Sequence, residues 1–134
     1  MIPNEVFWLT CTVYQEAQGE PKEGKLAVAY VIMNRCWTRN LRVPEVVFAP
    51  KQFSCWNEDS STRLRLTSIV GYAWWESAEV SDQAFNKTAL DPSLGATHYL
   101  NEKVTKQMRG VLPSWFKEEK VTVRIGNHTF LLLN

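Results

Sequence analysis

The chain has 134 residues, of which 45% are hydrophobic and 22% are charged, and its formal net charge is +1. This length fits a single domain of about 100–200 residues with a core of its own. The composition excludes disordered, collagen-like and disulfide-scaffold proteins. The longest apolar run, residues 26–33, is much shorter than the ~20 residues that span a bilayer, so we expect no stable membrane association. The near-neutral charge argues against nucleic-acid binding, which usually needs a strong basic excess.

The cysteines and histidines give no reason to expect a metal ion or another cofactor. Cys11, Cys36 and Cys55 lack the spacing of a zinc or disulfide framework, and the two histidines lack matched ligand spacing. Free cysteines are usually buried, so we interpret these three as small core side chains in a reducing compartment. The N-terminus shows no secretory signal, which makes synthesis in the cytoplasm the expectation.

Hydrophobic periodicity predicts that the first two thirds of the chain are helical. The apolar run 26–33 has no polar side, so its helix should be buried all round at the centre of the fold. Gly19 and the residue before Pro21 should end the helix before it. The expected helices, in chain order, are 3–17, 22–37, 45–48 and a long one that starts at Ser61 or Thr62 and includes Ser77.

The last third of the chain has the pattern of a small sheet. A short strand is expected within 96–100, and 121–125 is alternating and β-branched. Gly126 and Asn127 separate that strand from an apolar run at 128–133, which indicates a tight hairpin. The sequence therefore predicts a mainly helical α+β fold, in which 1–134 form one domain with a small C-terminal antiparallel sheet.

Glu16 is the best candidate for an acid catalyst, because cleavage of a glycosidic or peptide bond needs a proton donor near neutral pH. On a helical plot it lies at the edge of the apolar stripe, next to Leu9 and Thr12. Apolar neighbours and the negative end of a helix dipole both favour the neutral form of a carboxyl group. The small residues Ala17 and Gly19 leave room for a substrate. An ordinary glutamate that faces water is the alternative.

Five ordered blocks of the chain resemble the SleB-type cell-wall hydrolases, the family of spore-cortex-lytic enzymes. The blocks are YQEAQGEP (14–21), GKLAVAYVIMNR (24–35), QFS (52–54), GATHYLN (95–101) and RIGNHTF (124–130). Together they extend over nearly the whole chain, which makes the resemblance far more specific than the first block alone. The block at 95–101 departs from the family pattern, which usually has two consecutive aromatic residues there.

The resemblance implies a lysozyme-like catalytic domain that cuts the glycan strands of peptidoglycan. It implies one catalytic glutamate, here Glu16, which acts as acid and then as base and leaves a 1,6-anhydromuramic acid end. The alternative is a hydrolytic muramidase, in which a second carboxylate lies about 6.5–9.5 Å away (inverting) or about 5 Å away (retaining). The available carboxylates are Glu20, Glu58, Asp59 and Asp91. A non-catalytic glycan-binding module is a further alternative.

Several polar and aromatic residues are candidates for contact with the sugar. In the matched blocks, Tyr99 could line the cleft or the core, and Asn34 could bond Glu16 or a loop or cap a helix. We interpret His128 as structural. The expected substrate-binding residues are Asn34, Gln52, Ser54, Trp56, Tyr99 and Trp115.

The basic segment 102–113 looks longer than in the family and is expected to be a solvated loop, a lid or a strip that approaches anionic wall polymers. A monomeric catalytic domain without a separate wall-binding domain or an export signal fits a bacteriophage endolysin. Such a protein would accumulate in the host cytoplasm before it lyses the cell. A bacterial protein and a wall-degrading part of a phage particle are the alternatives.

Overall fold

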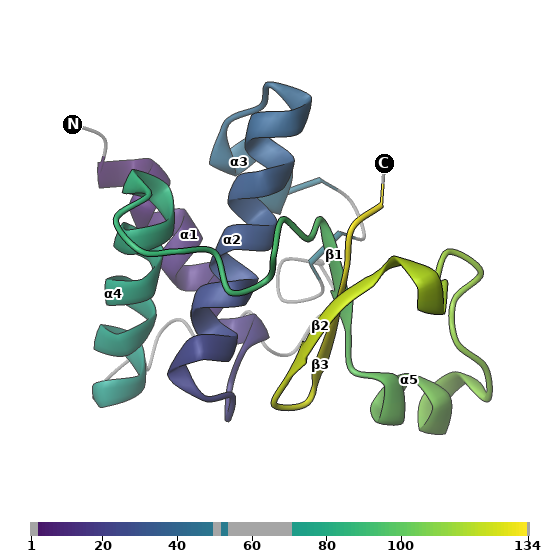
Figure 1. Cartoon of the computed structure of the whole chain (residues 1–134). Helices are drawn as coiled ribbons and strands as arrows, with labels where there is room; N and C mark the ends of the chain where they lie inside the picture. Colours follow the sequence, from purple (N-terminus) through teal and green to yellow (C-terminus); the bar gives the residue numbers. More distant parts are fainter. Residues whose placement is uncertain (1–2, 50–51, 54–70, 134) are drawn as a thin grey trace.

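The structure is a computed structural model that describes residues 3–49, 52–53 and 71–133. A layer of helices lies beside a small sheet (Figure 1). In chain order the elements are α1 (Pro3–Glu16), α2 (Lys22–Arg39), α3 (Val43–Val47), α4 (Tyr72–Asn86), β1 (His98–Leu100), α5 (Glu102–Arg109), the 3-10 turn η3 (Glu118–Lys120), β2 (Val121–Ile125) and β3 (His128–Leu131). Within the described residues, no helix combines the length and the apolar character that crossing a membrane requires.

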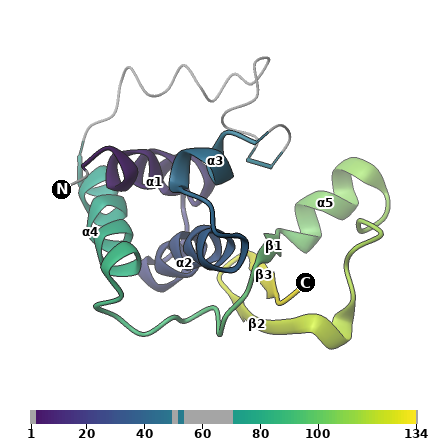
Figure 2. The ribbon, with the colours of Figure 1, turned by 90° about the horizontal axis from the view of Figure 1, so that it is seen from above.

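Helix α2 occupies the centre of the fold, as its apolar sequence predicts. Every residue from Ala27 to Met33 is buried, and α2 packs against α1, α3, α4 and β1. From above, α4 and the sheet lie on opposite sides of α2 (Figure 2). Asn40 ends the helix in the left-handed conformation with φ 53°, a position that asparagine tolerates better than most residues.

The turn between α1 and α2 forms where the sequence predicts it. Helix α1 ends at Glu16, Gly19 has φ 78°, and Pro21 is the N-cap of α2. A positive φ is readily adopted only by glycine, and proline disfavours the helical conformation in the residue before it. The same short turn therefore places Glu16 at the end of one helix and Glu20 close to the start of the next.

The sheet has three antiparallel strands in the order β1-β3-β2. The two-residue turn Gly126-Asn127 joins β2 to β3, and Ile125 pairs with His128. This hairpin and the mainly helical α+β fold were both predicted from the sequence. In the register of β1 with β3, Tyr99 is the partner of Phe130, so both side chains lie on one face of the sheet.

Two sequence predictions about helices are wrong. A helix that runs from residue 61 or 62 through Ser77 is not observed, because α4 starts at Tyr72, after Gly71 with φ 88°. That φ is incompatible with an α-helix, while residues 54–70 lie outside the described part. Of the alternatives for the segment 102–113, the solvated loop is wrong, because residues 102–109 form α5. Asn101 caps this helix, since its side chain accepts a hydrogen bond of 3.0 Å from the Val104 backbone N–H.

Two of the three cysteines lie in the core as predicted. Cys11 and Cys36 are buried free thiols, and burial raises the pKa of each to about 11. Both therefore stay protonated near neutral pH and behave as small apolar side chains. Cys55 lies outside the described residues.

Candidate active site

The carboxyl group of Glu16 meets a side chain from the sheet. The Tyr99 hydroxyl donates a hydrogen bond of 2.8 Å to Glu16 Oε1. Both residues are partly buried. The end of α1 and the strand β1 thus bring together two groups that are far apart in the sequence.

Helix α2 fixes the segment that carries Tyr99. The Asn34 side chain donates to the Ala96 carbonyl at 2.9 Å, and Arg35 Nε donates to the Thr97 carbonyl at 2.6 Å. Both acceptors directly precede β1, so the strand enters the sheet from a point tied to the central helix. Arg35 is 5% exposed, and burial lowers its pKa.

Two aromatic side chains from β3 pack against the Tyr99 ring. The ring centroids are 4.9 Å apart for His128 and 5.9 Å apart for Phe130. His128 is 8% exposed. Burial lowers its pKa, while the negative charges of Glu20 and Glu16 oppose this effect. The structural role predicted for His128 agrees with these contacts.

Two of the carboxylates considered for a hydrolytic mechanism are bound to other parts of the protein. Glu20 accepts hydrogen bonds of 3.0 Å from both the backbone N–H and the side-chain amide of Asn127. Asp91 accepts from the backbone N–H groups of Ser93 and Gly95 at 2.8 and 3.0 Å. Both groups hold turns in place, whereas Glu58 and Asp59 lie outside the described residues.

The structure gives two of the predicted sugar-binding residues partners within the protein. Of the alternatives for Asn34, the bond to a loop is the one observed, since its side chain donates to Asp91 and to the Ala96 carbonyl. It does not end a helix, because α2 continues to Arg39. Gln52 Oε1 accepts a hydrogen bond of 3.1 Å from Arg35 Nη1. Direct contact of either side chain with a sugar stays a prediction. Ser54 and Trp56 lie outside the described residues.

Trp115 packs on the other face of β1. Its ring centroid is 5.3 Å from that of His98. Because side chains alternate along a strand, His98 points away from the face on which Tyr99 meets Glu16. Trp115 is 37% exposed, but the structure does not bring it to Glu16.

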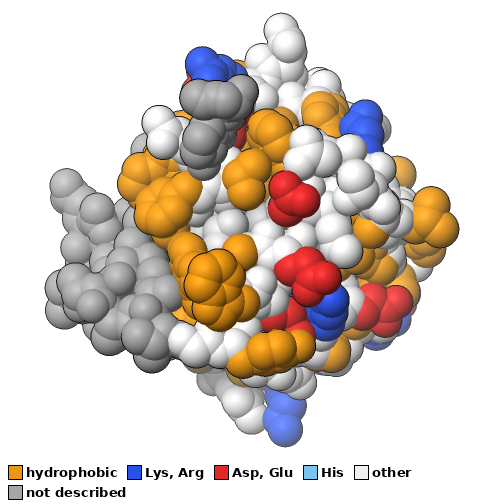
Figure 3. Space-filling view, turned by 90° about the vertical axis from the view of Figure 1, so that its left-hand side faces the viewer, with side chains coloured by type: hydrophobic (Ala, Val, Ile, Leu, Met, Phe, Trp, Pro, Cys, Tyr) orange, Lys and Arg blue, Asp and Glu red, His pale blue; other side chains and the backbone are white. Residues whose placement is uncertain are grey.

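Sequence reasoning missed a group of exposed aromatic residues on the helical side. Tyr72 and Trp75 on α4 are 76% and 69% exposed, and Phe7 on α1 is 47% exposed. The face on this side of the molecule carries several hydrophobic patches (Figure 3). The signal in the sequence was that Tyr72 and Trp75 fall outside the apolar stripe that includes Ser77.

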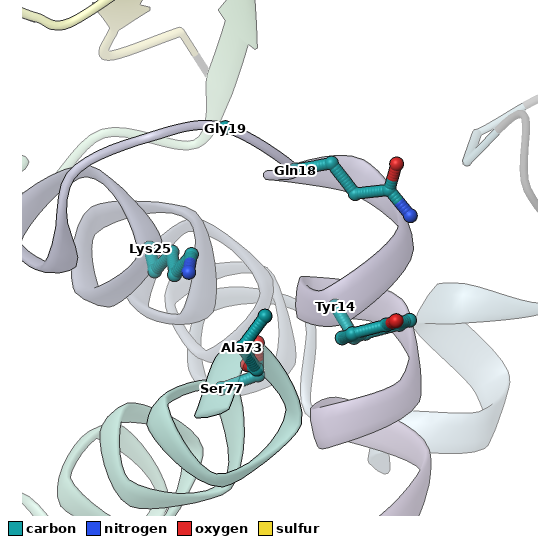
Figure 4. A pocket seen from close by; sticks show the side chains of 6 residues that line it. All are labelled: Tyr14, Gln18, Gly19, Lys25, Ala73 and Ser77. Atoms are coloured by element: carbon teal, nitrogen blue, oxygen red, sulfur yellow. Dashed lines mark hydrogen bonds between the residues drawn. The ribbon is translucent and has the colours of Figure 1, made fainter. Parts of the chain in front are cut away.

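A cavity of about 250 Å³ lies between α1, α2 and α4. Figure 4 shows the six residues that line it, namely Tyr14, Gln18, Gly19, Lys25, Ala73 and Ser77. Lys25 is bound within the protein, because its Nζ lies 2.9 Å from Glu76 Oε1. Tyr14 lies about 200° around α1 from Glu16, so this cavity is distinct from the Glu16–Tyr99 pair.

His98 should make the stability of the fold depend on pH. Burial and the charges of Arg35 and Arg39 lower its pKa to about 4, compared with about 6.5 in an unfolded chain. Between these values the unfolded state binds more protons, so stability is lost as the pH falls from about 6.5 to 4. We expect His98→Gln to show a smaller fall in Tm over this range than the natural chain. An equal fall in Tm for His98→Gln and the natural chain would show that the lowered pKa of His98 does not cause the pH dependence.

Comparisons with known proteins show the family and the fold of the chain. Residues 19–131 match the family model described as Cell Wall Hydrolase. The spore cortex-lytic enzymes of Oceanobacillus iheyensis and Halalkalibacterium halodurans are 29% and 30% identical to the chain over 132 residues. These alignments cover 95% of this chain but only 41% and 34% of the two relatives.

Two solved structures have a similar fold. The catalytic domain of the Bacillus cereus SleB protein is 26% identical with a TM-score of 0.73, and the match covers 97% of this chain and 91% of that one. The catalytic domain of the germination-specific lytic transglycosylase SleB from Bacillus anthracis is 23% identical with a TM-score of 0.71, covering 98% and 96%. The fold is thus that of SleB catalytic domains. The chain belongs to the Cell Wall Hydrolase family.

Proposed function

We propose that the chain cleaves the bond between N-acetylmuramic acid and N-acetylglucosamine in peptidoglycan, as a lytic transglycosylase. The observation that carries this proposal is the hydrogen bond from Tyr99 to Glu16 in a member of this family. The lytic transglycosylase activity named for the Bacillus anthracis structure supports the reaction type. Among the candidate carboxylates that the structure describes, Glu20 and Asp91 are both engaged in turns, which favours this reaction because hydrolysis would need a second carboxylate.

In the first step Glu16 acts as a general acid. Its proton passes to the glycosidic oxygen, and the bond between that oxygen and C1 of the muramoyl residue breaks. The Tyr99 hydroxyl donates a hydrogen bond to Glu16 Oε1, and this bond orients the carboxyl group. The hydrogen bond also stabilises the carboxylate that remains, because a bond to an ionised acceptor is about twice as strong as a neutral one.

In the second step the same carboxylate acts as a base. The muramoyl 6-hydroxyl attacks C1, and its proton passes to Glu16. The products are a 1,6-anhydromuramic acid end and a free 4-hydroxyl on N-acetylglucosamine, with no water consumed. Glu16 ends the cycle protonated, so one carboxyl group is enough for both proton transfers.

Tyr99→Phe tests the role of the hydroxyl group. We expect kcat to fall roughly 10–100-fold, because a hydrogen bond to a charged group contributes about 1.5–3 kcal/mol. KM should change little, since the bond strengthens in the transition state. Steady-state assays with soluble glycan strands measure both values. Tyr72→Phe is the control, because Tyr72 is 76% exposed and its hydroxyl should not affect kcat. An unchanged kcat for Tyr99→Phe would show that the Tyr99 hydroxyl has no role in the reaction.

Release of soluble muropeptides from purified bacterial walls tests the proposed function. The natural chain should release them, whereas a glycan-binding module would bind the walls without release. Binding without release, with the protein folded, would overturn the enzyme assignment in favour of that module.

We further propose that a bacteriophage uses this activity to lyse its host from the cytoplasm. The support is that Cys11 and Cys36 are free thiols, which agrees with synthesis in a reducing compartment such as the cytoplasm, and the test is expression in bacterial cells. Cells that contain the protein should stay intact until a pore-forming protein opens the inner membrane, and should then lyse. Absence of lysis after the membrane is opened would contradict this role.

A further inference from the structure

The carboxylate of Glu20 is buried at the junction of the helices and the sheet. Glu20 is 7% exposed. Its Oε1 accepts from the Asn127 backbone N–H, and its Oε2 accepts from Asn127 Nδ2, each at 3.0 Å. Glu20 belongs to the turn between α1 and α2, and Asn127 belongs to the β2–β3 hairpin. One side chain thus joins the helical layer to the tip of the sheet.

The hairpin approaches Glu20 so closely that the turn requires a glycine. A Cβ atom on Gly126 would collide with Glu20 Oε1 and touch Pro21. Gly126 also has φ 58°, which disfavours other residues. The position of the hairpin relative to the end of α1 is therefore set within narrow limits.

The residue after Asn127 connects this contact to the proposed catalytic pair. His128 packs on the ring of Tyr99 with 4.9 Å between the centroids, and Tyr99 donates to Glu16. Glu20 thus contacts Asn127, the neighbouring His128 contacts Tyr99, and Tyr99 contacts Glu16. Glu16 and Glu20 are only four residues apart in the sequence. A shift of the hairpin would therefore move the Tyr99 hydroxyl relative to the Glu16 carboxyl.

We propose that Glu20 is a positioning residue that holds Tyr99 against Glu16 by fastening the β2–β3 hairpin. The inference rests on the proposed function for its kinetic test. In this proposal Glu20 acts through its two hydrogen bonds with Asn127 and takes no part in proton transfer. Loss of the contact should lower kcat, since a displacement of about 1 Å at a reacting group can cost about 100-fold in rate.

Four variants distinguish a positioning role of Glu20 from a direct role in proton transfer. Glu20→Ala removes both bonds and should lower kcat roughly 10–100-fold, with a small effect on KM. Asn127→Asp places two carboxylates face to face and should lower kcat similarly. Glu20→Gln should keep most of the activity, because the Asn127 amide can rotate and accept a hydrogen bond from the new amide. The double variant Glu20→Gln with Asn127→Asp restores a donor–acceptor pair and should recover most of the activity lost in Asn127→Asp.

Two outcomes would overturn the proposal. If Glu20→Gln is as inactive as Glu16→Gln, then Glu20 is a reacting carboxylate. If Glu20→Ala keeps its kcat, or if the double variant fails to recover activity, then the contact does not position the pair. All assays are run well below the Tm of each variant, so that a loss of stability alone does not lower kcat.

A second measurement tests the positioning without any substrate. The NMR signal of the isotope-labelled Glu16 carboxyl carbon should shift in Tyr99→Phe, which loses the donor. Glu20→Ala should shift it in the same direction, and Glu20→Gln should not. Inactivity of the natural chain on cell walls would refute the proposed function but leave this result intact. An unshifted signal in Glu20→Ala would refute the role of Glu20 alone.

Discussion

Glu16→Gln should lower the rate of wall cleavage by about 10²–10⁴-fold, the range that general acid–base catalysis contributes. Glutamine has nearly the same shape and can still accept the hydrogen bond from Tyr99, but it cannot supply a proton. The variant should therefore fold, bind glycan strands and fail to release muropeptides. Release assays with equal amounts of folded protein measure the effect.

Glu23→Gln is the matched control for this substitution. Glu23 is exposed in the first turn of α2, so the change removes a carboxylate of the same type from a nearby surface position. Its activity should stay close to that of the natural chain. Unchanged release by Glu16→Gln would show that another group donates the proton.

Phe130→Ala should lower the free energy of unfolding by about 3–5 kcal/mol, the usual effect of removing a buried aromatic ring. Phe130 is fully buried in the middle of β3, the central strand of the sheet. For a domain of this size, the change corresponds to a fall in Tm of roughly 10–20 °C. Thermal unfolding followed by circular dichroism measures it.

The same substitution should also weaken the site, because Phe130 supports the Tyr99 ring. We expect a lower kcat even at temperatures where the variant is folded. Leu132→Ala is the control, since Leu132 is 45% exposed and lies just after β3. A small change of Tm in Phe130→Ala, similar to that of the control, would contradict the importance of this packing.

The elements that local sequence determines were predicted well. The bounds of α1 and α2 follow from helix periodicity, Gly19 and Pro21, and those of β2 follow from alternation and the Gly126 turn. In each case the deciding interactions lie within a few residues along the chain. The burial of α2 could also be predicted, because a helix without a polar side has no face for water.

The errors arise where local patterns conflict or are weak. The apolar spacing around residue 70 favoured a continuous helix, but the conformation of Gly71 prevents one. The polar segment after residue 101 lacked an apolar face long enough to indicate a helix, yet Asn101 caps α5. Neither error affects the site, because the end of α1 and the strand β1 carry its two central groups.

The sequence indicated which residues belong to the site, but it could not show which of their side chains contact one another. Glu16 was selected from its place at a helix end and from the family motif, and Tyr99 was left between the cleft and the core. The hydrogen bond between them depends on the contact of the sheet with the helices. The attachment of Glu20 to Asn127 is equally invisible in the sequence, since these residues meet only after the hairpin has docked.

Mass spectrometry of the muropeptides released in heavy-oxygen water tests the central claim most directly. If Glu16 is the only carboxyl group in the reaction, then the new muramoyl ends are 1,6-anhydro sugars, one water lighter than reducing ends and free of the heavy oxygen. Reducing ends that carry the heavy oxygen would show that water is the nucleophile. That result would contradict the lytic transglycosylase mechanism and require a second carboxylate.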